Sequence, residues 1–242
     1  PCPPADSAYF VEFQLTATIS DLKTAIAFAS FLEETETSCK VHLKIDTGMN
    51  RYGLRAEDFE SIREILKLKH LDVEGMFTHL ATADMPNNPG TQNQINRYTR
   101  LVHVLESENL RPEICHCSSS AGTLQHPETH FDMVRPGLVL YGYNPMGAFP
   151  SPWNIHPIMK IKATVRHIHE INPGEAVSYG GYWVARQPTK VATIAMGYGD
   201  GFLRGEYNKG FVKIRGQLCP ILGRVCMDAT MVDVSHIPNI QV

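Results

Sequence analysis

Ionisable and hydroxylic side chains follow directly after several short apolar runs of the sequence. Lys44 lies near the end of one run, His79 follows the next, serines occupy positions 118 to 120 after another, and Arg135 stands two residues before Gly137. Taken singly, each has an ordinary structural explanation: a surface ion pair, a hydrogen-bonded core histidine, or a turn. Grouped at the ends of successive strands, they instead indicate an active site assembled from several loops.

The first half of the chain alternates short apolar strands with amphipathic helices, a pattern typical of a parallel sheet. Ser20 is expected to cap a helix whose apolar positions are Leu22, Ile26, Ala29 and Leu32. Further helical periodicity occurs over 59–66 and 95–105. The expected strands of this half are 41–45, 73–78, 113–117 and 133–141.

The strand ends would converge on one rim of a TIM-type (β/α)8 barrel. Such a barrel needs about 250 residues, so the alternating region supplies at most four or five of its eight units. The second half changes to strands without long helices, over 159–168, 191–195, 211–214 and 231–234. The sequence therefore predicts an α/β fold with an incomplete barrel over 1–155 and a β-rich C-terminal domain over 156–242.

Composition favours a small-molecule partner. The 242 residues carry 22 basic and 25 acidic side chains, a formal charge of -3, and no long basic block, so neither nucleic acid nor a membrane surface is expected to bind. We find no uninterrupted apolar stretch of about 18 residues. The six cysteines form no CxxC pair, which favours reduced thiols and a cytoplasmic protein.

Two histidine patterns invite a metal interpretation. In Cys115-His116-Cys117 the two thiols would share one strand face and the imidazole the other, leaving too few ligands together, so core residues are expected. His167 and His169 would share a strand face, as in barrel metallohydrolases, but they open the β-rich domain and not a barrel strand. No metal site is therefore expected, and the hydrolase remains a minor alternative.

Motifs spread over nearly the whole chain resemble the alanine racemases, which are fold-type III enzymes that use pyridoxal phosphate (PLP). The first is the segment Val41 to Gly53, with Lys44, Asp46-Thr47-Gly48 and Arg51 in it. The others are Glu74–Asp84, Ser119-Ser120-Ala121, Met133–Gly137, Val177–Gly180, Gly197–Gly201 and Cys226-Met227-Asp228, in the family's order. The resemblance implies interconversion of L- and D-alanine, which supplies D-alanine for cell-wall synthesis.

The resemblance implies a role for three catalytic residues. Arg135 would face the pyridine nitrogen of PLP and, because guanidinium stays protonated, would leave that nitrogen without a proton. Reprotonation of the α-carbon is then favoured over transamination. Tyr179 would be the acid–base on one face of the α-carbon, opposite a lysine on the other face. His79 would link Tyr179 to Arg135, whose charge helps to lower the phenol pKa.

The resemblance also assigns the binding residues. Ser120, Gly137 and Leu138 would hold the PLP phosphate. Arg51 would reach the PLP phenolic oxygen or the substrate carboxylate, positioned by Lys44, which many family members carry in carbamylated form. Met227, Asp228 and Tyr198 would complete substrate recognition, with Arg204 holding the loop around Tyr198. In the family these β-domain groups enter the barrel of the other subunit, which implies a head-to-tail homodimer.

The sequence departs from the family pattern at its ends. The Lys-Ala-Asp-Ala-Tyr-Gly-like motif with the cofactor lysine is not found, nor are the last β strands, and the start at Pro1 resembles a cut. Position 119 is serine where many relatives have asparagine. The 242-residue chain alone is therefore expected to be inactive. A serine or broad-specificity racemase and a non-catalytic PLP-binding or dimerisation module remain alternatives.

Overall fold

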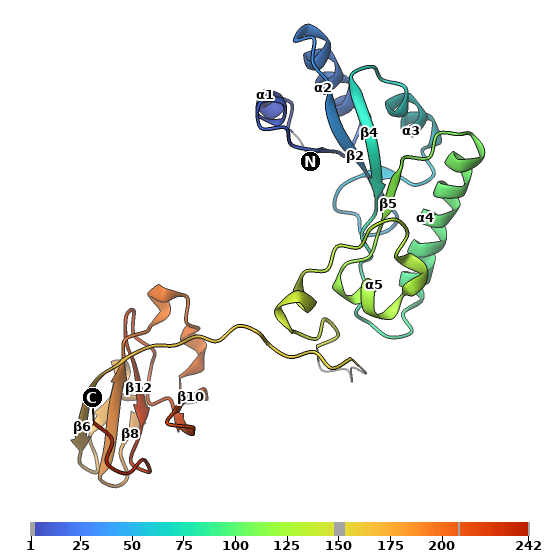
Figure 1. Cartoon of the computed structure of the whole chain (residues 1–242). Helices are drawn as coiled ribbons and strands as arrows, with labels where there is room; N and C mark the ends of the chain where they lie inside the picture. Colours follow the sequence, from blue (N-terminus) through green and yellow to red (C-terminus); the bar gives the residue numbers. More distant parts are fainter. Residues whose placement is uncertain (1–2, 148–152, 208, 242) are drawn as a thin grey trace. The chain divides into compact units, whose positions relative to one another are not determined.

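The computed structural model describes residues 3–147, 153–207 and 209–241 (Figure 1). The chain divides into two compact units, residues 1–159 and 160–242. The helices of the first unit are α1 Ser7–Glu12, α2 Leu22–Glu34, α3 Phe59–Leu66, α4 Pro89–Ser107 and α5 Ser120–Gln125, with 3-10 turns η1 Pro4–Asp6, η2 Pro127–Thr129 and η3 Leu138–Tyr141. Its strands are β1 Ala17–Ile19, β2 Cys39–Asp46, β3 Leu54–Arg55, β4 Leu71–Phe77 and β5 Ile114–His116.

The strands of the first unit form a parallel sheet in the order β1-β2-β4-β5, with β3 paired to the end of β2. One face of this sheet packs on helices α2, α3 and α4 around a core that includes Leu43, Met76 and Leu101. Period-two alternation turns His42 and Lys44 of β2 away from this core. Each parallel strand therefore buries one set of apolar residues and presents the other set to the interior of the barrel-type unit.

Helix α2 begins one residue later than a cap at Ser20 would require. The N-cap is Asp21, which is extended, and its Oδ1 accepts the N–H of Thr24 at 2.8 Å. Ser20 instead donates its hydroxyl to the Asp21 carboxylate at 3.3 Å, so the predicted cap was wrong. The buried face is Ala25, Phe28 and Leu32, and Ile26 is 43% exposed. A carboxylate accepts charge-assisted hydrogen bonds, which explains why it outcompetes the neighbouring hydroxyl.

The Asp21 cap predicts a stability difference between adjacent substitutions. Asp21→Ala is expected to lower the free energy of unfolding by about 1 kcal/mol, because it removes the acceptor for the first turn of α2. Ser20→Ala, the matched control, should change it by less than about 0.5 kcal/mol. Urea unfolding of both variants followed by circular dichroism measures the difference; equal losses would contradict the assignment.

The segment 133–141 is not the strand that its apolar residues suggested. Residues 133–137 belong to no strand, although the backbone N–H of Arg135 donates to Ser118 O, just after β5, at 2.9 Å. Residues 138–141 form the turn η3. Pro136 lacks an N–H and cannot donate to a ladder, and the turn that follows ends the extended stretch. The segment nevertheless lies beside β5, which brings Arg135 to the strand ends.

The second unit is built from strands β6 Val165–Ile171, β7 Ala176–Val177, β8 Trp183–Val184, β9 Thr189–Ile194, β10 Phe211–Ile214, β11 Gln217–Pro220 and β12 Thr230–Asp233. The turns η4 Tyr179–Gly181, η5 Tyr198–Asp200 and η6 Arg204–Glu206 connect them. An antiparallel sheet β12-β9-β6 and the hairpin β10-β11 form a core that includes Val232 and Ile221. The hairpin β7-β8 contributes Val177 and Trp183 to a second, smaller cluster. The strand expected from 159 begins only at Val165; of the six residues before it, Thr164 accepts the backbone N–H of Ala195 at 2.9 Å, but none belongs to a strand.

The described residues include no helix with both the length and the apolar content that crossing a bilayer requires.

Candidate active site

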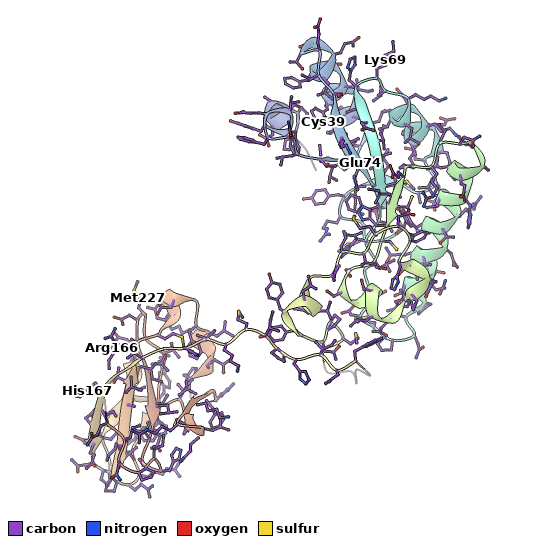
Figure 2. The ribbon with its side chains drawn as sticks, in the orientation of Figure 1. Cys39, Lys69, Glu74, Arg166, His167 and Met227 are labelled. Carbon is purple, nitrogen blue, oxygen red and sulfur yellow. The ribbon has the colours of Figure 1, made fainter. Side chains whose placement is uncertain are left out.

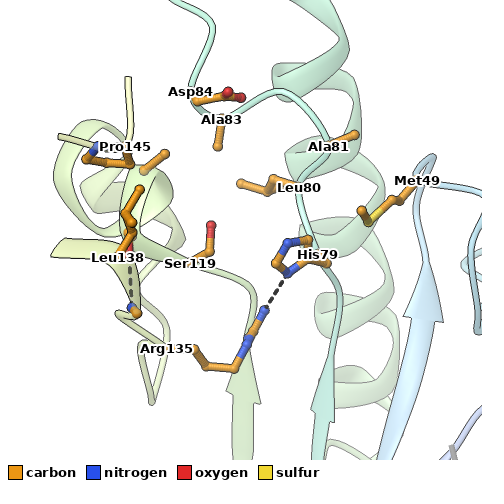
Figure 3. A pocket seen from close by; sticks show the side chains of 13 residues that line it. Met49, His79, Leu80, Ala81, Ala83, Asp84, Ser119, Arg135, Leu138 and Pro145 are labelled. Carbon is orange, nitrogen blue, oxygen red and sulfur yellow. Dashed lines mark hydrogen bonds between the residues drawn. The ribbon is translucent and has the colours of Figure 1, made fainter. Parts of the chain in front are cut away.

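A cavity of about 380 Å³ opens at the strand ends of the first unit (Figure 3). Such a volume suits a small molecule or cofactor. Five residues predicted to bind PLP line it together, and they are His79, Ser120, Arg135, Gly137 and Leu138. The structure thus brings together residues from His79 to Leu138, 59 positions apart in the chain, that were predicted to share a site only from the family motifs.

Arg135 is the best-connected side chain of the cavity. One Nη donates to His116 Nδ1 at 2.5 Å, and the other contacts His79 Nδ1 at 3.3 Å and the carbonyls of Thr78 and Cys117 at 3.0 and 3.2 Å. Burial lowers the pKa of Arg135 from its ordinary value, which is high enough to keep the group charged. A guanidinium only donates, so both ring nitrogens that it contacts must be unprotonated acceptors.

His79 lies beside Arg135 in the lining of the cavity, and a dashed line in Figure 3 marks the contact between them. Its pKa is lowered by burial and then by the positive charges of Arg135, Arg51 and Lys44. With Nδ1 accepting from Arg135, the neutral ring carries its proton on Nε2. That N–H can hold a hydroxyl or phenolate oxygen in a defined position.

Gln94 of α4 fixes the backbone on which His79 stands. Its buried amide accepts the N–H of Ala81 at 2.8 Å and donates to His79 O and Thr47 Oγ1, both at 3.1 Å. The amide orientation is determined because the N–H of Ala81 can only donate. One glutamine thereby ties the loop after β2 to the loop after β4.

Ser120 organises the turn beside the cavity. Its Oγ accepts the N–H groups of Gly137 and Val139 at 2.9 and 3.3 Å. A Cβ built on Gly137 would meet nothing within 4 Å, so open space lies in front of that backbone. A molecule can therefore approach the backbone of this turn closely.

Lys44 and Arg51 lie on and after β2. Lys44 is buried, donates to Ile45 O at 2.7 Å and lies 5.4 Å from the centre of the Phe77 ring. Burial lowers the pKa of Lys44 to about 8, with the cations Arg135 and Arg51 adding to the effect and Asp46 opposing it. Arg51 is exposed. The chain returns after Arg51 through Gly53, at φ +123, where a Cβ would strike Lys44 O at 2.8 Å.

The predicted residues of the second unit lie on two loops that pack together. Tyr198 N donates to Cys226 O at 3.0 Å and Gly199 N to Met227 O at 2.7 Å. Gly197 permits this approach, since a Cβ there would lie 2.3 Å from Cys226 O. The Arg204 guanidinium lies 5.5 Å from the centre of the Tyr198 ring. Met227 and Tyr198 are 65% and 45% exposed, and Asp228 is exposed too.

Tyr179 begins the turn η4 and is 68% exposed. The preceding residue, Ser178, has φ +66 and donates its hydroxyl to Arg224 O at 2.6 Å. This bond anchors Tyr179 to the loop that leads to Met227. The predicted link from Tyr179 to His79 would join the two units, and it stays a prediction.

Sequence reasoning overlooked the two histidines behind Arg135. His116 was interpreted as an ordinary core residue and His42 was given no role, yet His42 Nδ1 and His116 Nε2 lie 2.8 Å apart. The His116 ring also stacks on Phe77, with 4.9 Å between centroids and 5° between planes. The signal was present, because His42, Lys44 and His116 all occupy strand positions alternate to buried apolar residues.

His116 predicts acid sensitivity of the folded protein. Burial, followed by the charges of Arg135 and His42, lowers its pKa from 6.5 to about 3. Between these values the unfolded chain binds the proton and the folded chain does not, so stability present above pH 6.5 is lost as pH falls. One such group costs about 1.4 kcal/mol per pH unit in this window. Urea unfolding at a series of pH values should show this slope, and His116→Gln should flatten it; an unchanged slope in the variant would refute it.

His167 and His169 stack on strand β6 with ring centroids 5.0 Å apart. Within residues 3–147, 153–207 and 209–241, no third histidine, cysteine or carboxylate joins them. The same residues contain no other group of three or more such side chains that could hold a metal ion. This arrangement lends no support to the metallohydrolase alternative.

Comparison with known families accounts for both units. The alanine racemase N-terminal domain matches residues 1–145, and the alanine racemase C-terminal domain matches residues 158–242.

The chain belongs to the alanine racemase family.

Individual relatives agree with this assignment. The alanine racemase of Desulfovibrio desulfuricans is 38% identical over 238 residues, which cover 98% of this chain and 64% of the relative. The solved alanine racemase of Clostridium difficile 630 superposes with a TM-score of 0.89 at 32% identity, covering all of this chain and 63% of that one. The chain therefore spans somewhat less than two thirds of the length of these racemases.

A third relative was solved with a cofactor. The alanine racemase of Bartonella henselae, with covalently bound pyridoxal phosphate, superposes with a TM-score of 0.81 at 25% identity, covering 98% of this chain and 65% of that one. Together the comparisons confirm the predicted family and the predicted fold class, a barrel-type α/β unit followed by a β-rich domain.

Proposed function

We propose that the protein carrying this chain is a PLP-dependent racemase that interconverts L- and D-alanine. The observation that carries the proposal is the placement of Arg135, a half-buried guanidinium that lines the cavity and whose two Nη groups contact neutral histidines. A fixed cation that cannot accept a proton suits a pyridine ring nitrogen. Family membership supports the same cofactor and the same reaction.

The residues of the cavity fit PLP. Open space in front of Gly137 and the hydroxyl of Ser120 suit a phosphate, together with the backbone at Leu138. Ser120 Oγ accepts two N–H groups and keeps its own proton for a phosphate oxygen. When bound, PLP supplies an electron sink that acidifies the α-hydrogen of an amino acid.

Tyr179 is proposed to exchange that proton on one face of the α-carbon. The Nε2–H of His79 would donate to the phenolic oxygen, and the charge of Arg135 behind His79 would favour the phenolate. A lysine outside these 242 residues would serve the opposite face and hold the cofactor. Tyr179 belongs to the second unit, whereas His79 and Arg135 belong to the first. We propose that a second protomer in a head-to-tail homodimer contributes Tyr179.

Substrate recognition is proposed to involve Arg51, Met227, Asp228 and Tyr198. The exposed guanidinium of Arg51 can bind the carboxylate of an amino acid. The backbone N–H of Met227 would be a second donor, on the loop that Gly199 holds. Tyr198, steadied by Arg204, would narrow the approach and favour a small side chain such as that of alanine.

Lys44 is expected to react with carbon dioxide. Carbamylation requires the neutral amine, and a pKa of about 8 leaves about half of the amine neutral at pH 8. The resulting anion would pair with Arg51 and point it toward the cavity. Native mass spectrometry in bicarbonate should find the added mass of carbon dioxide, absent in Lys44→Gln. An unmodified Lys44 amine under these conditions would contradict the expectation.

The racemase proposal is tested with the full-length protein, meaning the chain with whatever segments flank it in its gene. With PLP and L-alanine it should form D-alanine, whereas the 242-residue chain alone should form none. Failure of the full-length protein to form D-alanine would overturn the proposal. Faster turnover of L-serine than of L-alanine would favour the serine racemase alternative, and PLP binding without turnover would favour the non-catalytic module.

A cytoplasmic location and a role in cell-wall synthesis complete the proposal. Cys39, Cys115, Cys117 and Cys219 are buried free thiols and Cys226 is a half-buried one, as expected in a reducing compartment. Cys2 lies outside the described residues. D-Alanine for the cell wall would be the physiological product.

A further inference from the structure

A line of polar side chains leads from Arg135 through the interior face of the sheet. His116 of β5 follows Arg135, His42 of β2 follows His116 at 2.8 Å, and Glu74 of β4 follows His42, with Glu74 Oε1 at 3.5 Å from His42 Nε2. Figure 2 marks Glu74 on its strand. Three neighbouring strands thus contribute one residue each to a connected series.

Only one arrangement of protons satisfies this series. Arg135 donates and cannot accept, so His116 Nδ1 is unprotonated and the ring proton of His116 is on Nε2. That N–H must donate to His42 Nδ1, which places the proton of His42 on Nε2, facing the Glu74 carboxylate. Reversing the bond between the two rings would leave His116 without a proton on either nitrogen, and removing the Nε2 proton from His42 would do the same to His42.

The surroundings hold each member in place. Tyr98 accepts the backbone N–H of His116 and donates to Met76 O, which ties β5 to β4 beneath the ring. Glu74 also accepts from Lys40 Nζ at 2.6 Å and from Thr16 Oγ1 at 3.1 Å, so the carboxylate stays charged and oriented. The charged end of the series is therefore held by Thr16, just before β1, and by Lys40 of β2 as well as by its own strand β4.

Gly75 makes room for the middle of the series. A Cβ at Gly75 would lie 2.4 to 2.6 Å from three atoms of the His42 ring, and His42 pairs with Gly75 across the two strands. The strand register shifts between Val41 and His42, which seats the ring over this glycine. The space for the His42 ring therefore exists because residue 75 has no side chain, and no neighbouring side chain has to move to provide it.

We propose that His116, His42 and Glu74 form a proton-ordered chain that positions Arg135. Because this proton order makes His116 Nδ1 a permanent acceptor, one Nη of Arg135 always has the same partner. That bond fixes the plane of the guanidinium relative to His79 and the cavity. These three are positioning residues, because they act through Arg135. Their functional role rests on the proposed racemase activity, whereas their proton order does not.

Proton order can be read in the uniformly 15N-labelled 242-residue chain without cofactor. Long-range 1H–15N correlation spectra distinguish protonated from unprotonated ring nitrogens, and His116→Gln and His42→Gln assign the signals. We expect both histidines to carry the proton on Nε2 alone at neutral pH. A proton on Nδ1 of either ring, or a doubly protonated ring, would overturn the proposal.

Gly75→Ala tests the coupling within the chain. The added methyl must displace the His42 ring, so the His116 Nε2 proton should exchange with water about tenfold faster, the effect of losing a hydrogen bond of about 1.4 kcal/mol. Asp72→Ala, at an exposed position of the same strand, is the control. If circular dichroism shows that Gly75→Ala does not fold, His42→Leu is used in its place, because it removes the same acceptor, His42 Nδ1. An unchanged exchange rate of the His116 Nε2 proton in a folded variant would refute the proposed series of hydrogen bonds.

The positioning role has its own test in the full-length protein. Gly75→Ala should lower kcat about tenfold, and Asp72→Ala should leave it unchanged. If the proton order is as stated but kcat does not fall, the series is structural only and the positioning role is refuted. If the wild-type protein has no racemase activity, the racemase proposal fails and the proton order stands on the spectra.

Discussion

Replacing Tyr179 with phenylalanine is expected to lower kcat for alanine racemisation by about 10²- to 10⁴-fold, the range for loss of a general acid–base group. The ring remains, so the turn η4 and its anchor from Ser178 to Arg224 should persist. Only the phenolic proton carrier is lost. Circular dichroism and racemase kinetics of the full-length protein measure the two consequences separately.

Proton exchange gives the Tyr179 prediction a stereochemical signature. In deuterium oxide, Tyr179→Phe should still exchange the α-hydrogen of one alanine enantiomer, because the base on the opposite face is retained, and should lose exchange of the other. Tyr9→Phe, at a tyrosine that is 57% exposed on the first unit, is the control and should retain both. Equal residual exchange of both enantiomers in Tyr179→Phe would contradict the two-base proposal.

Replacing Arg135 with leucine is expected to lower kcat/KM by about 10²- to 10³-fold, as for loss of a preorganised charged donor. Leucine fills much of the volume but leaves His116 Nδ1 and the Thr78 and Cys117 carbonyls without their donor. Unpaired buried polar groups of this kind cost about 1–3 kcal/mol each, so the free energy of unfolding should fall as well.

Arg135→Lys separates charge from geometry. Lysine keeps the positive charge but presents one ammonium in place of the planar group that reaches four partners, so activity should still fall markedly. Arg100→Lys, at an exposed position of α4, is the matched control and should match the wild type. Full activity in Arg135→Lys would show that charge alone suffices there and that the fixed geometry is unimportant.

Strand positions in the first unit were predictable from alternation, because Val41, Leu43 and Ile45 must share the core face. The same alternation assigns His42 and Lys44 to the other face. It was applied to Cys115 and Cys117 but not carried across to His42, which is why the histidine pair went unnoticed. Contacts across strands depend on register, and the shift between Val41 and His42 has no visible signature in the sequence.

Other differences have local causes. Ser20 and Asp21 are both good caps, and the choice between them rests on the Asp21 carboxylate, which accepts the N–H of Thr24. The segment around Pro136 has the apolar residues of a strand, yet pairing depends on neighbours that a linear pattern does not contain. For Tyr179 no local pattern points to a catalytic residue, since an exposed tyrosine beside glycine is common at turns, and its role came from the family resemblance alone.

The central claim is that Arg135 of one protomer and Tyr179 of its partner serve one site, and subunit mixing tests it most directly. Full-length Tyr179→Phe and Arg135→Leu proteins, each almost inactive, would be dissociated, mixed in equal amounts and reassembled. A head-to-tail dimer of one of each has one site with both defects and one with neither, so activity should recover to about a quarter of the wild-type value. No recovery, with mixed dimers demonstrated by native mass spectrometry, would contradict the account.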